Sequence, residues 1–215
     1  MTVSPFTGAL IAGGRSSRMG RDKAFLDWQG RPLWEVQLAK LRAAGAAELL
    51  ICSRREQAFT GDDFRFVPDD VEDLGPLAGL VNALKAASHD HVLVLAVDMP
   101  FITVELLADL GSQRREEADA DAAPGNPPRH LGGYAASASA TVQGIIPVRD
   151  GRFEPLAAIY PRCVLALAEA HLAGTDRSLQ GFCRAAEAAG LVRSWTETEE
   201  WSEQFRSVNT PRELQ

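Results

Sequence analysis

Short apolar runs alternate with segments of helical spacing through the N-terminal half of the chain, and this alternation constrains the fold more than any other feature. Such runs predict buried strands, at 6–12, 49–52, 64–67 and 92–97. Helical segments lie between them, at 33–44 and 77–87. Strands separated by helices favour an α/β fold with a doubly wound, mostly parallel sheet and helices on both faces. Because such sheets bind ligands beyond the carboxyl ends of their strands, we expect the functional residues there.

The C-terminal half resumes the pattern after an interruption. Residues 111–144 are rich in Ala, Gly, Pro, Ser and charged residues, which favours a flexible insertion. Beyond it the sequence predicts strands at 144–148 and 153–160, a hairpin turn at Asp150-Gly151, and helices at 164–172 and 179–188. The chain has 215 residues and 46% of them are apolar, so we expect a single domain over 1–215 that contains the insertion.

Composition excludes several classes of function. The net charge of −7, from 29 acidic and 22 basic residues, argues against a surface built to bind nucleic acid or an anionic membrane. No apolar stretch approaches the roughly 20 residues that span a bilayer, and the N-terminus has no signal-peptide pattern. Cys52, Cys163 and Cys183 have no metal-site spacing, and we interpret all three as small packing residues. We therefore expect a cytoplasmic protein.

A glycine-rich loop follows the first predicted strand. Four cations gather there in an otherwise acidic chain: Arg15, Arg18, Arg21 and Lys23. The adjacent glycines Gly13 and Gly14 let successive backbone N–H groups approach phosphate oxygens, while Arg18 and Lys23 supply charge. The glycine spacing matches neither a Walker A loop nor a dinucleotide fingerprint. The loop predicts a triphosphate site, and the alternative is a solvated, charged turn.

Asp98 emerges from the carboxyl end of the run at 92–97. Mg²⁺ prefers hard oxygen ligands and commonly takes one or two carboxylates together with substrate phosphates. Asp98 is therefore predicted to bind magnesium. The alternative is that Asp98 caps the next helix, but Thr103 lies closer to that helix and is itself a good cap. The four histidines are interpreted as surface or structural residues.

A third group of polar residues follows the run at 64–67. It contains Asp69, Asp70, Glu72 and Asp73, ahead of a glycine-proline helix start. A carboxylate can accept hydrogen bonds from the ring N–H and the exocyclic amine of guanine. For Asp70, Glu72 and Asp73 a solvated turn is an equal alternative.

Together these motifs resemble the molybdenum cofactor guanylyltransferase family. The resemblance covers nearly the whole chain, and its motifs occur in the family's order: Leu10-Ile11-Ala12-Gly13-Gly14, Ser17-Arg18-Met19-Gly20, Asp22-Lys23, Gly30-Arg31-Pro32-Leu33, Gly75-Pro76-Leu77-Ala78-Gly79, Asp98-Met99-Pro100-Phe101, Glu154-Pro155-Leu156 with Tyr160, and Val208-Asn209-Thr210-Pro211. The resemblance implies a Rossmann-like nucleotidyltransferase fold and a magnesium-dependent transfer of GMP from GTP to molybdenum-bearing molybdopterin. The implied products are pyrophosphate and the guanine dinucleotide cofactor.

The resemblance also implies roles for individual residues. Nucleotide contacts are implied for Ile11, Ala12, Gly13, Gly14, Lys23, Asp69 and Asp98. Within this set, Lys23 holds the phosphates, Asp69 contacts the nucleoside and Asp98 also binds magnesium, while Arg18 assists catalysis beside Lys23 and Asp98. On the acceptor side, the matching residues are Pro155, Tyr160 and Asn209.

The chain departs from the family's pattern in two places that concern the pterin. Residues 111–144 form a longer stretch than usual, and Ser207 stands where the family often has Asn. One alternative function is a cytidylyltransferase or another nucleotidyltransferase with the same loop, although 75–79 and 98–100 favour guanylyl transfer. A non-catalytic carrier of nucleotide or pterin is the other alternative. Expected partners are GTP, molybdopterin, and molybdoenzymes or cofactor-insertion proteins, with no nucleic acid or membrane.

Overall fold

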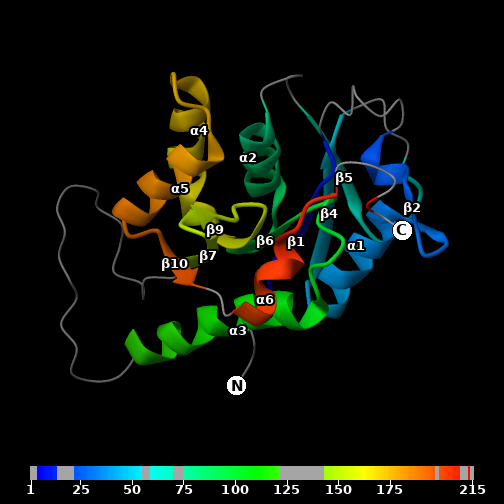
Figure 1. Cartoon of the computed structure of the whole chain (residues 1–215). Coiled ribbons are helices and arrows are strands. Elements are labelled where there is room, and N and C mark those ends of the chain that lie inside the picture. Colours follow the sequence, from blue (N-terminus) through cyan, green and yellow to red (C-terminus); the bar gives the residue numbers. More distant parts are fainter. Residues whose placement is uncertain are drawn as a thin grey trace.

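The computed structural model describes residues 4–13, 22–54, 59–69, 75–121, 143–196, 199–208 and 213, with the backbone alone at 113–121 and 199–200. Strands and helices alternate along the chain (Figure 1). The elements up to the middle of the chain are β1 (Thr7–Ile11), η1 (Lys23–Phe25), β2 (Asp27–Trp28), β3 (Arg31–Pro32), α1 (Leu33–Ala43), β4 (Glu48–Ser53), β5 (Arg65–Pro68), α2 (Pro76–Ala86), β6 (His91–Ala96) and α3 (Val104–Asp121). The remaining elements are β7 (Gly144–Arg149), β8 (Arg152–Phe153), β9 (Ala157–Pro161), η2 (Arg162–Val164), α4 (Leu165–Ala173), α5 (Leu179–Ala188), β10 (Val192–Thr196), α6 (Glu199–Ser202) and η3 (Glu203–Phe205).

The main sheet is doubly wound about β1. Its strands lie in the order β10-β7-β9-β6-β1-β4-β5, and β8 pairs with β7 outside this path. Strands β5, β4, β1 and β6 are parallel, whereas β9 is antiparallel to both β6 and β7. The chain runs outward from β1 to β4 and β5, and then returns to β6 on the other side of β1. The predicted doubly wound, mostly parallel sheet is confirmed, with β8 and β9 as its reversed strands.

The register brings the ends of the parallel strands to one edge. Ile11 at the end of β1 is paired with Cys52 of β4 on one side and with Ala96 of β6 on the other. Ser53 at the end of β4 is paired with Pro68 of β5. The residues that follow these ends therefore emerge together, at the point where the strand order reverses, which is where open α/β sheets bind ligands.

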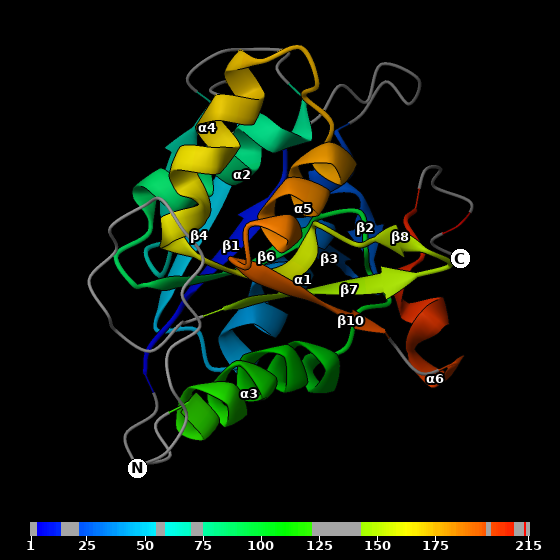
Figure 2. The same cartoon turned by 90° about the vertical axis from the view of Figure 1, so that its left-hand side faces the viewer.

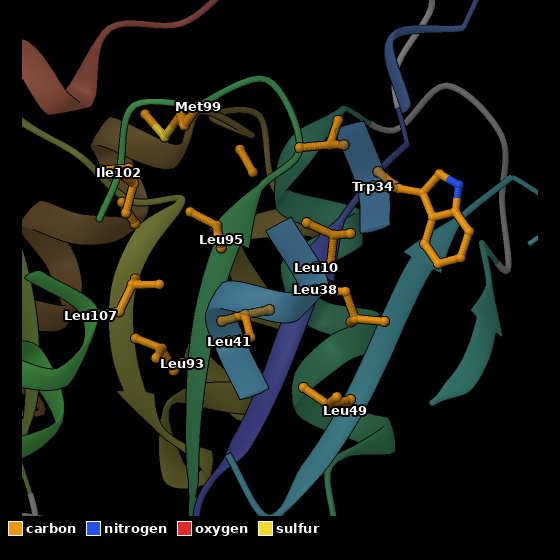
Figure 3. Close-up of a cluster of buried hydrophobic side chains, with 14 of the residues drawn as sticks. Leu10, Trp34, Leu38, Leu41, Leu49, Leu93, Leu95, Met99, Ile102 and Leu107 are labelled. Carbon is orange, nitrogen blue, oxygen red and sulfur yellow. The ribbon is translucent and has the colours of Figure 1, made fainter. Parts of the chain in front are cut away.

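Helices cover both faces of this sheet, α1 and α3 on one side and α2, α4 and α5 on the other (Figure 2). Successive strand residues point to opposite faces. One set packs with α1 and α3, and it includes Leu10, Leu49, Leu93 and Leu95 (Figure 3). Ile51 belongs to the same set. The other set packs with α2, α4 and α5, and it includes Ala9, Ile11, Leu50, Cys52, Val92 and Val94. Burying one leucine side chain contributes about 1.5–3 kcal/mol to folding. Because β1 contributes residues to both layers, packing on both faces keeps it in the centre of the sheet.

The strand predicted at 153–160 is in fact two strands. A turn over Glu154, Pro155 and Leu156 separates β8 from β9, and Ala157 N donates to Glu154 O at 3.2 Å. Proline has no N–H for a sheet ladder, which explains the break. The predicted hairpin turn is confirmed, because Asp150 and Gly151 have φ angles of 49° and 71° between β7 and β8, as a two-residue hairpin turn of type I′ requires.

Two further predictions need correction, and three strands lack a prediction. Helix α3 continues to Asp121, so the first part of the expected insertion at 111–144 is helical, while 122–142 lies outside the described residues. Strand β10 and the small β2–β3 hairpin were not predicted. Cys163 is exposed and not a packing residue, whereas Cys52 and Cys183 are buried, and burial raises the pKa of Cys183 to about 12. Among the described helices, none is both long and apolar enough to cross a membrane.

Glu48 joins the amino ends of three strands, at the edge opposite the predicted site. Its carboxylate accepts hydrogen bonds from Thr7 Oγ1 at 2.7 Å, Ser88 N at 2.8 Å and Arg65 at 2.7 Å. Burial alone would raise the pKa of Glu48, but the bonds from Ser88, Thr7 and Arg65 together lower that pKa below its ordinary value of 4.5. A depressed carboxyl pKa stabilises the fold above the unfolded-state pKa, and this stabilisation is lost as the pH falls through the folded-state value.

Replacing Glu48→Gln should lower the free energy of unfolding at pH 7 by about 1–3 kcal/mol, because it removes a charged acceptor from several donors. The difference between wild type and variant should shrink as the pH falls below about 4.5. Urea unfolding from pH 7 to pH 3.5 measures it. Glu169→Gln is the matched control, since its pair with Lys85 is 46% exposed on both sides and should contribute little. A difference that stays constant with pH would contradict the role given to Glu48.

Candidate nucleotide-binding site

The end of β1 lies at the centre of the site. Ala12 N donates to Cys52 O at 2.9 Å, and Val97 N donates to Ile11 O at 3.0 Å. Ile11 is only 4% exposed and Ala12 only 2% exposed, so their side chains belong to the core and a ligand can meet them through the backbone. Gly13 is half-buried and is the last residue described before 14–21.

Lys23 returns to this edge on the short helix η1. Asp22 caps η1, because its Oδ1 accepts a hydrogen bond from Ala24 N at 3.1 Å. The other carboxylate oxygen of Asp22 accepts from Arg54, at 3.3 Å. Arg54 is the residue directly after β4. Through its contact with Asp22, the end of β4 therefore helps to fix the position of Lys23.

Asp98 lies in the turn that follows β6, residues 97–100, which we call the Asp98 turn. Lys23 Nζ donates to Asp98 Oδ2 at 3.0 Å, and the two side chains are 21% and 28% exposed. The C-terminal segment contacts the same turn, because Val208 N donates to Asp98 O at 2.8 Å. Thr103 Oγ1 accepts from Leu106 N at 3.3 Å, so Thr103 caps α3 and Asp98 does not. The structure thus brings the predicted phosphate-binding lysine and the predicted magnesium ligand into direct contact.

Asp69 approaches from the end of β5. Its backbone N–H donates to Ser53 O at 2.8 Å, and its Oδ1 accepts from Asn82 Nδ2 at 3.3 Å. Its Oδ2 faces Gly13, since a Cβ added to Gly13 would lie 3.0 Å from that oxygen. Three strand ends that the sequence singled out therefore converge, with Asp69 and Asp98 on opposite sides of β1.

The predicted acceptor residues are only partly placed at this edge. Leu156 O accepts from Ala96 N at 2.7 Å, so the turn that contains Pro155 lies beside the end of β6. Tyr160 is fully buried, and its hydroxyl donates to Pro155 O at 2.8 Å. Burial raises the pKa of Tyr160, which keeps the hydroxyl protonated as a donor. Tyr160 therefore supports the Pro155 turn from inside the core, and direct contact with an acceptor was the wrong prediction for it.

Several predicted residues lie outside the described residues: Gly14, Arg18, Asp70, Glu72, Asp73 and Asn209. The structure instead adds two polar residues that the sequence reading missed. Arg54 follows a parallel strand directly, so the same strand-end rule could have found it. Asn82 is a buried carboxamide within the apolar helix α2, between Val81 and Ala83.

The arrangement fits a magnesium ion whose ligands come partly from the protein and partly from a bound nucleotide. Asp98 offers a partly exposed carboxylate that already attracts one cation, Lys23. Within the described ranges, no group of three or more His, Cys, Asp or Glu side chains could hold a metal by itself. Because Mg²⁺ at nucleotide sites commonly takes one or two carboxylates, with phosphates and water as the other ligands, one aspartate at this edge is a suitable donor set.

Comparison with known proteins identifies the family of this chain. A family model described as the MobA-like NTP transferase domain matches residues 8–189, which include Lys23, Asp69 and Asp98. The chain belongs to this family. The matched range runs from β1 to the end of α5.

Relatives in the family share much of the sequence. A protein of Opitutus terrae named probable molybdenum cofactor guanylyltransferase is 39% identical over 89% of this chain and 81% of its own length. The molybdenum cofactor guanylyltransferase of Pseudomonas putida is 32% identical over 99% of this chain and 97% of its own length. The crystal structure of molybdopterin-guanine dinucleotide biosynthesis protein A from Archaeoglobus fulgidus superposes with a TM-score of 0.66 at 22% identity, over 97% of this chain and 93% of that one. The last likeness shows a shared Rossmann-like nucleotidyltransferase fold.

Replacing Gly13→Ala should weaken GTP binding about 10-fold, because the new Cβ meets Asp69 Oδ2 and overpacking typically costs about 1–3 kcal/mol. Isothermal titration with GTP measures the affinity. Gly111→Ala in α3 is the control, since a Cβ there meets nothing within 4 Å. The control should leave GTP affinity unchanged and add about 0.5–1 kcal/mol of stability. Equal GTP affinity in wild type and Gly13→Ala would show that this glycine does not face the nucleotide.

Proposed function

We propose that the protein transfers GMP from GTP to molybdenum-bearing molybdopterin, which yields molybdopterin guanine dinucleotide and pyrophosphate. The observation that carries the proposal is the 3.0 Å contact between Lys23 and Asp98 at the reversal point of the sheet. This pairing supplies a cation for phosphates and a carboxylate for a metal ion at one place. Two relatives that align with at least 89% of the chain are named as guanylyltransferases of this cofactor.

The proposed reaction is an in-line displacement at phosphorus. An oxygen of the acceptor's terminal phosphate forms a bond to the α-phosphorus of GTP. The bond from that phosphorus to the bridging oxygen of the β-phosphate breaks, and its electron pair leaves with pyrophosphate. Negative charge grows on the leaving oxygens, so cations placed there lower the barrier. The acceptor phosphate is already largely ionised near neutral pH and needs orientation more than a general base.

Lys23 and Asp98 divide the electrostatic work in this proposal. Lys23 turns from Asp98 to the phosphates and neutralises the charge of the leaving group. Asp98 would hold the magnesium ion, and the ion would supply Lewis acidity at the phosphate groups. Arg54 keeps Lys23 in place through Asp22. Because each charge exchanges one opposite partner for another, the nucleotide can enter without leaving a charge unpaired.

The acceptor is proposed to bind beside the end of β6, next to the Pro155 turn. Arg149 Nε, at the end of β7, donates to Oε1 of Glu154, the first residue of this turn, at 2.9 Å. Burial raises the pKa of Glu154, and Arg149 opposes that shift. The C-terminal segment reaches the same region through Val208. The acceptor would thereby lie between the Pro155 turn and the Asp98 turn, in reach of the α-phosphate.

The rival functions differ in the nucleotide that reacts. We expect pyrophosphate release with GTP and molybdopterin, and a kcat/KM with CTP at least about 100-fold lower, because Asp69 offers a carboxylate that suits hydrogen-bond donors of guanine. A coupled pyrophosphate assay with GTP, CTP and ATP in turn measures this preference. Faster turnover with CTP would favour a cytidylyltransferase. GTP binding without pyrophosphate release would favour a carrier.

Variants of the central pair test its chemical role. Asp98→Ala should lower kcat by about 100-fold or more, as losing a major electrostatic contribution typically does. Lys23→Ala should weaken GTP binding by about 10-fold, since it removes a charged contact to the phosphates. Activity should also depend on added Mg²⁺ and disappear with a chelator.

Two matched variants serve as controls for these losses. Asp90→Ala removes an exposed carboxylate at the opposite end of β6, and Lys85→Ala removes a lysine from an exposed ion pair. Both should behave like wild type. Near-normal turnover in Asp98→Ala would refute the assignment of the metal to that residue.

A further inference from the structure

We propose that Gln37 and Lys40 of helix α1 are positioning residues that hold the Asp98 turn in its place opposite Lys23. The inference rests on the proposed function, because it assigns these residues a part in the same transfer reaction. They lie three positions apart and so share one face of α1, the face towards the Asp98 turn.

Gln37 grips the Asp98 turn on both sides of the aspartate. Its Nε2 group donates one hydrogen bond to Ala96 O at 3.2 Å and another to Met99 O at 2.8 Å. Lys40 Nζ donates to the next carbonyl, Pro100 O, at 2.6 Å. Three backbone carbonyls around Asp98 are therefore directed at side chains of a single helix.

The same helix also sets the position of Lys23. Leu33 N, at the start of α1, donates to Leu26 O at 2.9 Å, and Leu26 N donates to Lys23 O at 3.2 Å. The short helix of Lys23 is thus attached to the first turn of α1, and the Asp98 turn is attached to its middle. Because a helix is stiff over this length, α1 fixes the spacing between the two charged groups.

Gln37 would lower the stability of the fold if it served packing alone. It is 0% exposed, and its Oε1 accepts no hydrogen bond from the described residues. A buried polar atom without a partner destabilises the fold. Its surroundings are apolar, with Leu33, Leu38 and Leu41 on the same helix. An apolar side chain of similar size would avoid this cost, which indicates that the two N–H donors serve the turn.

The carbonyls that Gln37 contacts would not be left without donors in its absence. Met99 N also donates to Ala96 O at 3.4 Å, and Ile102 N also donates to Met99 O at 3.3 Å. When leucine replaces Gln37, these backbone carbonyls therefore keep their hydrogen bonds and the space between α1 and the sheet stays filled. The Asp98 turn, however, loses the contact that fixes its orientation. A loss of precise placement, separate from a loss of folding, is the expected effect.

The test compares Gln37→Leu, Lys40→Met and the control Gln143→Leu, which removes a hydrogen bond to Gly190 O far along the chain. Thermal unfolding reports folding, and Gln37→Met serves if the leucine variant unfolds. Steady-state kinetics should show kcat about 10–100-fold lower in Gln37→Leu with the KM for GTP raised by no more than about 10-fold, because misplacing a catalytic group harms the transition state more than substrate binding. Lys40→Met should give a smaller loss of the same kind, and Gln143→Leu none.

A second readout does not depend on turnover. The affinity for GTP is measured by calorimetry with and without Mg²⁺, and the gain due to Mg²⁺ should fall about 10-fold in Gln37→Leu. In the Asp98→Ala background, Gln37→Leu should cause no further loss of that gain, because Gln37 acts through Asp98. An unchanged kcat and Mg²⁺ gain in folded Gln37→Leu, or an equal further loss in the Asp98→Ala background, would overturn the inference. A wild type that binds Mg²⁺ and GTP but transfers nothing would instead reject the proposed function.

Discussion

Hydrogen bonding of β1 to β4 on one side and to β6 on the other brings the carboxyl ends of the parallel strands to one edge, on which the rest of the site depends. The register places Ile11 level with Cys52 and Ala96, so the segments that leave these strands start from the same edge. Packing on both faces opposes a one-residue shift in the register of β1, because each of its side chains would then point to the opposite face of the sheet. Gly13, Asp69 and Asp98 emerge at the same edge because of this one constraint, although they are far apart in sequence.

The charged side chains at this edge form an ion pair whose partners a nucleotide and its metal ion can replace. Lys23 and Asp98 neutralise each other at 3.0 Å, and both remain partly exposed. A triphosphate with its divalent ion carries the complementary charges, so it can replace each partner with one of the same sign. Supporting residues act one step further out: Arg54 through Asp22, and Asn82 through Asp69. The structure thus combines a rigid sheet edge with side chains whose pairing a ligand can change.

The sequence predicts the fold correctly where a local pattern of residues determines the position of an element in the sheet. Apolar runs predict the parallel strands, and the rule that ligands bind beyond strand ends places Lys23, Asp69 and Asp98 at one edge of the sheet. The prediction fails where the position depends on tertiary contacts. Gln37 looks like an ordinary polar residue on a helix, and only the packing of α1 shows that it is buried against the Asp98 turn. Tyr160 matched an acceptor motif, but the motif does not reveal that its ring lies in the core.

The most direct test of the central claim is a crystal structure with Mn²⁺ and a non-hydrolysable GTP analogue, with the metal located by its anomalous scattering. We expect a metal peak in contact with an Asp98 carboxylate oxygen and with phosphate oxygens, while Lys23 Nζ has left Asp98 and contacts the triphosphate. A metal bound elsewhere, or a Lys23–Asp98 contact that persists with the nucleotide in place, would contradict this claim.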